Sequence, residues 1–291
     1  MKRKPFVGWL LLSPAILWIL LIVIYPFVSA IRLSFMKTAF GFGLMRPNGL
    51  ENYRLVLGDE AFWRAFLTSF WWTLGNLILQ LTLPMFVALL LRRKFAGRDA
   101  LRSIILTPWI IPAVVIAILW RWLLEPTVGI LNSILHSLHI VDKPVSFLGR
   151  PDLALVSIIL VNTWRFAPLG TVLILAALQT IPEVLYEAAR VDGASPVQEF
   201  LRITFPLLGN VVWFVGLLAS IWTFNILDLI WLMTQGGPGT STQTMPVLIY
   251  QTAFKTYQMG IASAMAVMTA MGLIVLAFVY FCFMKPRESG E

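Results

Sequence analysis

Acidic side chains gather in one short polar stretch of this sequence, where they could take part in acid–base chemistry. Glu183, Glu187, Asp192 and Glu199 all fall within residues 179–206, and a positioned pair of carboxylates can donate and accept protons in a transition state. A nucleophile activated by a histidine and an acid is the other common solution. The sequence has no spacing that indicates such a triad, so we predict no catalytic residues and do not class the chain as a membrane enzyme.

Two histidines have a spacing that metal sites use. His136 and His139 are separated by one helical turn, which could present both imidazoles on one helix face. No further group of ligands accompanies them, and the single cysteine, Cys282, lies in the last apolar run, so an intrachain disulfide and a cysteine-based metal site are excluded. We interpret the histidines as part of a solvated surface helix and expect no metal and no bound cofactor.

An ATP-binding P-loop would require a lysine directly after a glycine, in the pattern G-x-x-x-x-G-K-[ST]. No lysine in this chain follows a glycine. Any ATP that drives the protein is therefore hydrolysed by another chain.

Composition predicts a membrane protein. Of the 291 residues, 59% are hydrophobic and 12% are charged, and the mean hydropathy is +0.83, whereas about a quarter of the residues in a soluble domain are charged. The net charge of +8 does not indicate a nucleic-acid partner, because the basic residues stand between apolar runs rather than in a stripe with aromatic residues. Lipid is the expected solvent.

Apolar runs of about 20 residues or more can cross a hydrocarbon core about 30 Å thick, and they predict about six transmembrane helices. The predicted spans are 6–30, 66–91, 103–123, 153–178, 207–233 and 259–284. We expect an all-α integral membrane protein in which residues 1–291 form a single domain. An even number of spans puts both termini on one side, and the surplus of Lys and Arg in alternate short loops puts that side in the cytoplasm.

Polar side chains inside the spans are costly unless they face a partner or a water-filled cavity, so they are functional candidates. The ones that we single out are Asn76, Gln80, Asn162, Arg165, Thr223, Asn225 and Asp228. At about 1.5 Å per residue, Arg165 should lie about 15 Å below the outer surface of the membrane and Asp228 about 7 Å below it. Their side chains would have to extend a long way toward each other to form a direct ion pair. Backbone carbonyls or an acid from another subunit are alternative partners for Arg165. Ion-coupled secondary carriers usually have more intramembrane carboxylates, of which Asp228 is the one candidate here.

The cytoplasmic stretch 179–206 is itself patterned as two short helices. Thr180 and Glu183 have the spacing of a capping box, and Gly193 stands where a left-handed helix stop is favoured. Ser195 and Gln198 repeat the start signal, and the second helix should end before Pro206. The pattern predicts a helix–turn–helix loop, and a pair of interfacial helices lying against the bilayer is the alternative.

This loop resembles the EAA loop of binding-protein-dependent ABC importer permeases. The matching residues are Glu187, Ala188, Ala189, Asp192, Gly193, Ala194, Ile203 and Pro206. The departures are Phe205, where Leu usually precedes the proline, and Gly209-Asn210, where a further proline is common. The resemblance implies a type I importer permease fold in which these residues form coupling helices that sit in clefts of cytoplasmic ATPase subunits.

Further segments resemble the maltose-type sugar permeases, in particular their first-subunit branch. They are Asn162-Thr163-Trp164, residues 177–182 and residues 234–239. In that subfamily the fourth and fifth core spans contact the sugar, and the matching positions here are Asn162, Arg165, Phe166, Leu169, Trp222, Thr223 and Ile226. We add the neighbouring polar Asn225 to this candidate substrate path. Arg165 and Ile226 differ from the residues of the maltose permease.

The resemblance implies a permease subunit of the cytoplasmic (inner) membrane of a bacterium or archaeon that imports a carbohydrate by alternating access. Its implied partners are a second, non-identical permease, two ATPase subunits that use ATP and Mg²⁺, and an extracytoplasmic solute-binding protein. An asparagine and aromatic faces suit a neutral oligosaccharide, whereas Arg165 favours an anionic sugar derivative or glycerol phosphate. An ion-coupled secondary carrier is the remaining alternative.

Overall fold

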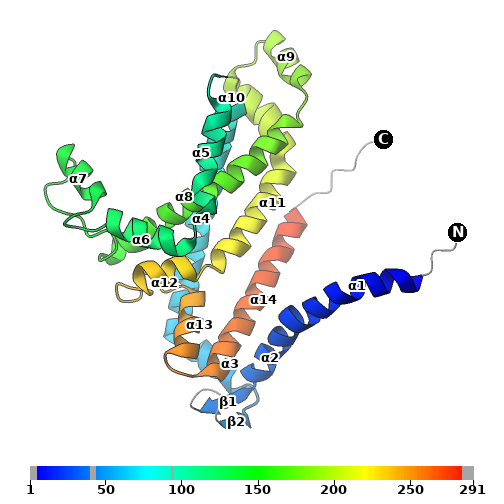
Figure 1. Ribbon diagram of the computed structural model, residues 1–291, viewed down its shortest axis with the longest axis vertical. Helices are drawn as coiled ribbons and strands as arrows, with labels where there is room; N and C mark the ends of the chain where they lie inside the picture. The colour runs from blue at the N-terminus through cyan, green and yellow to red at the C-terminus, as the bar shows by residue number, and fades with distance from the viewer. Residues whose placement is uncertain (1–4, 40–43, 93–94, 284–291) are drawn as a thin grey trace. The chain divides into compact units, whose positions relative to one another are not determined.

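The computed structural model describes residues 5–39, 44–92 and 95–283, and it is almost entirely helical (Figure 1). The described residues group into two compact units. One comprises Met1–Arg64 and Leu248–Gly272, and the other comprises Ala65–Val247 and Leu273–Glu291. Five described helices are long and apolar enough to cross a membrane, and a bent helix pair supplies a sixth span if it is counted as one. The predicted fold class is therefore confirmed.

The first unit begins with a helical segment in which one π-helical turn separates two α-helices. This helix comprises α1 (Pro5–Ile19), the π-helical turn η1 (Leu20–Ile24) and α2 (Tyr25–Ser34). A hairpin of β1 (Met36–Ala39) and β2 (Leu44–Pro47) follows, with Met36 opposite Pro47, and then α3 (Glu51–Gly58). Asn52 ties α3 to the hairpin, because its Nδ2 donates to the carbonyls of Ser34 and Met36 at 2.8 and 2.9 Å.

The second unit contains the helices that matter for function. In chain order they are α4 (Glu60–Arg92), α5 (Arg98–Ile110), α6 (Ala113–Leu123), α7 (Ile130–Ser137), α8 (Pro151–Gln179), α9 (Glu183–Val191), α10 (Pro196–Glu199), η2 (Phe200–Thr204), α11 (Phe205–Phe224) and α12 (Asp228–Thr234). The chain continues through α13 (Met245–Phe254) and α14 (Met259–Phe283). These two helices and α4 contribute residues to both units. In Figure 1, α9 and α10 lie at one end of α8 and α11, and α12 lies at the other.

The third predicted span, 103–123, is not one straight helix. Helices α5 and α6 meet at a bend of 96°. Ile111 has φ −67° and ψ 131°, and Pro112 follows it. The residue before a proline is driven from the helical to the extended conformation by the proline ring, which explains the break.

The fifth predicted span, 207–233, is also interrupted. Helix α11 ends at Phe224, and α12 starts at Asp228. Asn225 donates its side-chain amide to the carbonyl of Ile221 at 2.8 Å, so it satisfies a carbonyl that the helix end leaves without an intrahelical partner.

Two prolines are accommodated by π-helical turns instead of helix ends. The π turns η1 and η2 end two residues before Pro26 and Pro206, and Tyr25 and Phe205 donate to carbonyls five residues earlier, Leu20 and Phe200. A wider turn relieves the clash of a proline ring with the preceding turn and absorbs the missing N–H. The expectation that the second loop helix ends before Pro206 is therefore wrong, since a continuous helical segment runs from Pro196 to Phe224.

Candidate functional site

The start of the 179–206 loop differs from the predicted capping box. The hydroxyl of Thr180 donates back to the carbonyl of Ala177 at 2.8 Å, and the N-cap of α9 is Pro182. Proline fixes φ near the helical value but offers no side-chain acceptor, so the helix begins one residue after it. Glu183 is thereby released from capping, and it pairs with Arg92 of α4 instead.

The tight turn between the two loop helices is confirmed. Gly193 has φ +79°, a left-handed conformation that favours glycine. Its N–H donates to the carbonyl of Arg190 at 3.1 Å, and the N–H of Ala194 donates to the carbonyl of Ala189 at 2.9 Å. These two bonds form a Schellman motif, which closes the C-terminal end of α9.

The predicted start of the second helix is confirmed as well. The N–H of Gln198 donates to Ser195 Oγ at 3.4 Å, and the N–H of Ser195 donates to Gln198 Oε1 at 2.8 Å. This reciprocal capping box satisfies two backbone donors at the start of α10. The loop is therefore a defined helix–turn–helix rather than an irregular connection.

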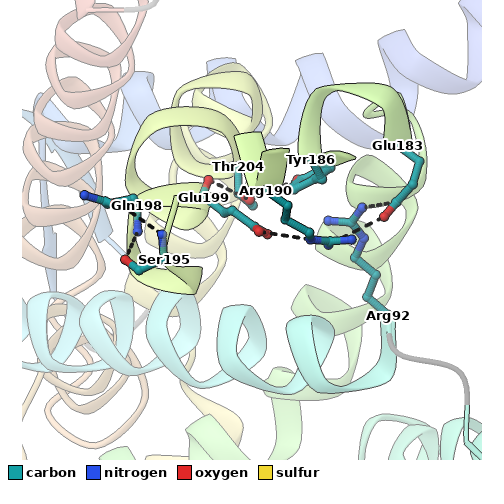
Figure 2. A network of polar contacts seen from close by, with 8 residues as sticks. All are labelled: Arg92, Glu183, Tyr186, Arg190, Ser195, Gln198, Glu199 and Thr204. Carbon is teal, nitrogen blue, oxygen red and sulfur yellow. Dashed lines mark hydrogen bonds and ion pairs between the residues drawn. The ribbon is translucent and has the colours of Figure 1, made fainter. Parts of the chain in front are cut away.

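A chain of alternating charges joins the loop to α4 (Figure 2). The Arg92 guanidinium lies 2.7 Å from the Glu183 carboxylate, which lies 3.7 Å from Arg190, and Arg190 Nε donates to Glu199 at 3.0 Å. The hydrogen bond to Glu199, followed by that residue's negative charge, raises the pKa of the Arg190 guanidinium above its ordinary value. Arg190 therefore stays charged, and the two loop helices are held together by opposite charges.

Tyr186 forms the buried side of the same arrangement. Its side chain is 2% exposed, its hydroxyl lies 2.9 Å from Thr204 Oγ1, and the guanidinium of Arg92 lies 4.0 Å from its ring centroid. A cation over an aromatic face is attracted by the ring quadrupole. The sequence patterns did not identify Tyr186, Thr204 or the contacts of Arg92 with the loop. A large aromatic residue among the polar residues of α9 could have indicated that Tyr186 is buried.

Several apolar side chains of the loop are exposed, and we name this set of residues the docking face. It consists of Val184, Ala188, Val191, Val197 and Leu201. Val191 is 88% exposed and Val184 is 68% exposed, far more than a core valine would be. Of the residues that match the EAA pattern, Glu187, Ala188, Asp192, Gly193 and Pro206 are exposed, and Ala189, Ala194 and Ile203 are half-buried.

The candidate substrate path contains a buried polar network. Asn162 is fully buried, and its Nδ2 donates to Asn76 Oδ1 at 2.7 Å. Gln80 donates to the same oxygen at 3.2 Å. The Oδ1 of Asn162 has no hydrogen-bond donor in the part of the chain that the structure describes, and an unpaired buried acceptor is costly.

Three of the predicted path residues surround one small cavity. Phe166, Leu169 and Trp222 line a cavity of about 30 Å³, together with Gln80. Trp222 is 49% exposed. The remaining path residues lie elsewhere. Thr223 and Ile226 are buried, Asn225 bonds to its own helix, and Asn162 does not line this cavity.

Arg165 and Asp228 form an ion pair despite the distance expected between them. Arg165 Nη1 lies 3.6 Å from Asp228 Oδ2, and their side chains are 17% and 50% exposed. The depth expected for Asp228 assumed one straight helix over 207–233, whereas α11 ends at Phe224 and Asp228 opens a separate helix. The break between α11 and α12 therefore makes the contact possible.

The helix at the two histidines includes only the first of them. His136 is an exposed residue of α7, and His139 follows that helix with φ +55°. Among the residues that the structure describes, no group of three or more His, Cys, Asp or Glu side chains is placed to hold a metal ion.

Several known proteins are similar to this chain. The trehalose/maltose transport system permease MalF of Thermococcus litoralis is 32% identical over 96% of this chain and 93% of its own length. The sulfoquinovosyl glycerol transport system permease SmoG of Agrobacterium fabrum is 32% identical over 96% of this chain and 90% of its own.

The fold is shared with a solved structure of a bacterial ABC transporter involved in the import of the acidic polysaccharide alginate. The TM-score is 0.83, the identity is 23%, and 97% of each chain is covered. The family model for the inner membrane component of binding-protein-dependent transport systems matches residues 80–285. This chain therefore belongs to the family of inner-membrane components of binding-protein-dependent transport systems, as the EAA-like loop predicts.

Proposed function

We propose that this chain is one membrane subunit of an ATP-driven importer that moves a carbohydrate across the cytoplasmic membrane by alternating access. The docking face carries the proposal. Val184, Val191 and Val197 are exposed on a capped, ion-paired helix–turn–helix, and exposed apolar patches on ordered elements mark interaction sites. An apolar, ordered surface of this kind suits the clefts of cytoplasmic ATPase subunits.

Energy comes from these partner subunits, because no lysine of this chain follows a glycine and no P-loop is possible. The assembly contains a second, non-identical permease, two ATPase subunits that bind ATP and Mg²⁺, and an external solute-binding protein. Both termini of this chain lie in the cytoplasm, on the side of the docking face. Closure of the ATPase subunits on ATP displaces the loop and switches the path between inward-facing and outward-facing states.

A carbohydrate is the solute class that the path supports. The names of the relatives include permeases for trehalose/maltose and for sulfoquinovosyl glycerol. Phe166 and Trp222 supply aromatic faces for the C–H surfaces of a sugar, and the buried, unpaired Oδ1 of Asn162 supplies an acceptor for a hydroxyl once the path opens. Arg165 is already neutralised by Asp228, which favours a neutral sugar.

An anionic sugar derivative, or glycerol phosphate, is the second candidate. The Arg165–Asp228 contact of 3.6 Å is longer than a hydrogen bond, and a bidentate phosphate or carboxylate would bind a guanidinium more strongly.

The test is uptake by the complete assembly in proteoliposomes, with this chain, its permease partner, the ATPase subunits and the binding protein. We expect uptake that requires ATP inside the vesicles and the binding protein outside, with neutral di- and oligosaccharides preferred over sugar phosphates and uronates. Uptake that persists without ATP while an ion gradient is present would assign the chain to the secondary carriers. A preference for the anionic solutes would reverse the order of the two candidates.

A further inference from the structure

Helix α4 contacts residues 179–206, which we call the docking loop, without being next to them in the chain. Helix α8 leads directly into the loop, and α11 continues directly out of it. Helix α4 is joined to the loop by no adjacent segment. Its last residue, Arg92, makes polar contacts with the loop, and Met85, Ala88 and Leu91 belong to the same buried apolar cluster as Tyr186.

The contacts at Arg92 are of two kinds. Its guanidinium lies 2.7 Å from Glu183 Oε2 at the first turn of α9, and it lies over the ring of Tyr186 one turn later, 4.0 Å from the centroid. The hydroxyl of Tyr186 in turn reaches Thr204 in η2 at 2.9 Å. Arg92 therefore links α4 to α9 directly, and through Tyr186 to the helix that becomes α11.

Burial distinguishes this ion pair from an ordinary surface pair. The side chain of Arg92 is 22% exposed and that of its partner Glu183 is 57% exposed, whereas Arg150 and Asp152, which also pair closely, are 57% and 58% exposed. Exposed pairs contribute little, because water screens them and two flexible side chains must be ordered. A charge-assisted contact whose guanidinium is shielded and lies over an aromatic face holds its geometry better.

Helix α4 also reaches the candidate path. Gln80 of α4 lines the cavity that Phe166 and Trp222 share, about 18 Å along the helix axis from Arg92 at 1.5 Å per residue. Pro84 lies between these two positions inside the continuous helix α4. It packs tightly against α8, because a Cβ added at Gly170 would lie only 3.1 Å from Pro84 Cγ. A displacement at Arg92 can therefore be transmitted along α4 rather than lost at the proline.

We propose that Arg92 is a positioning residue that transmits the movement of the docking loop through Glu183 and Tyr186 into α4 and so to Gln80 in the path. This inference rests on the proposed function, because it requires ATPase subunits that move the loop. Without Arg92, the loop still docks and still moves α8 and α11, but α4 follows less closely, because only the apolar packing around Tyr186 still joins it to the loop.

The experiment compares Arg92→Met with the wild-type chain in the co-expressed complex with its ATPase subunits, using Mg·ATP as the probe. Hydrogen–deuterium exchange is followed in residues 76–84 of α4 and in residues 183–191 of α9. We expect Arg92→Met to retain the ATPase subunits and the ATP-dependent change in α9. The ATP-dependent change in α4 should fall about tenfold, which corresponds to about 1.4 kcal/mol of coupling.

Three further variants separate positioning from stability. Arg150→Met removes an exposed ion pair from the same unit and should leave both changes as in wild type. Arg92→Lys, which keeps the charge, should restore part of the α4 response. Glu183→Gln should lower that response, and the double variant with Arg92→Met should be no worse than the more severe single variant, because both changes break the same pair.

The possible outcomes distinguish this inference from the proposed function. An α4 response in Arg92→Met equal to that of wild type overturns the inference and leaves the importer function intact. A wild-type chain that neither co-purifies with ATPase subunits nor changes its exchange in α9 on addition of Mg·ATP overturns the proposed function and the inference together.

Discussion

Replacing Gly193 with valine should uncouple the docking loop while leaving the membrane fold in place. Gly193 has φ +79°, a conformation that costs an L-residue about 1–2 kcal/mol and a β-branched residue more. No described atom lies within 4 Å of a Cβ added at this position. The cost is therefore backbone strain in the turn and not a steric clash.

The magnitude follows from that strain. A penalty of about 2 kcal/mol lowers the ratio of intact to opened turn by about thirtyfold. The two hydrogen bonds of the turn, from Gly193 and Ala194, are the contacts that are lost. Gly193 takes no part in the packing of the membrane spans. We therefore expect the free energy of unfolding of the detergent-purified chain to fall by no more than this local penalty.

The assay measures co-purification with the ATPase subunits and ATP-dependent uptake in the reconstituted complex. Asparagine tolerates the left-handed conformation, so Gly193→Asn should retain most of both activities. Gly58→Val is a matched control, because Gly58 has equally open surroundings but no positive φ. Normal uptake and normal ATPase association in Gly193→Val, with Gly193→Asn also normal, would refute the assignment of this turn to energy coupling.

Three further predictions address the path, the docking face and the loop that follows α6. Asp228→Asn should leave Arg165 as an unpaired cation and destabilise the chain by about 1–2 kcal/mol. It should also increase inhibition of uptake by uronates or sugar phosphates, which competition assays would measure; an unchanged inhibitor profile would place Arg165 outside the path. Val191→Asp should leave thermal stability within about 0.5 kcal/mol but reduce recovery of the ATPase subunits in affinity purification, and full recovery would exclude Val191 from the contact. Hydrogen bonds from the Val128 amide, then the Thr127 hydroxyl, hold the pKa of Glu125 below its ordinary value of 4.5. Its stabilisation is therefore complete above pH 4.5 and lost as the pH falls through the lowered pKa. Amide exchange at Val128 should accelerate in that acidic range, and Glu125→Gln should abolish the dependence; a dependence that survives the substitution would assign it to another group.

Patterns that depend on local chemistry could be read from the sequence. The left-handed turn at Gly193 and the Ser195–Gln198 capping box lie where they are predicted, because each depends on residues a few positions apart. The number of apolar spans, about six, is also a local property, because length and hydropathy alone decide whether a helix can cross a bilayer. The family, too, was indicated by a contiguous loop pattern.

Where prolines act on a helix could be anticipated only in part. Pro112 breaks the third span, whereas Pro206 leaves its helix continuous after a π turn. Both residues lack the N–H and carry the same ring, so the chemistry of proline does not determine the outcome. Whether the surrounding helices favour a bend or a widened turn is a property of their packing.

Long-range contacts were decided by the tertiary structure alone. The pair of Arg165 with Asp228 requires the break after Phe224, and the contact of Arg92 with Glu183 joins residues that are far apart in the chain. Thr180 and Glu183 had the right types and spacing for a capping box, but the N-cap is Pro182. Thr180 bonds back to Ala177 instead, and Glu183 pairs with Arg92. Residue types and spacing determined which local motifs were possible, and packing determined which partner each polar group met, because a carboxylate bonds to whichever donor the fold brings nearest.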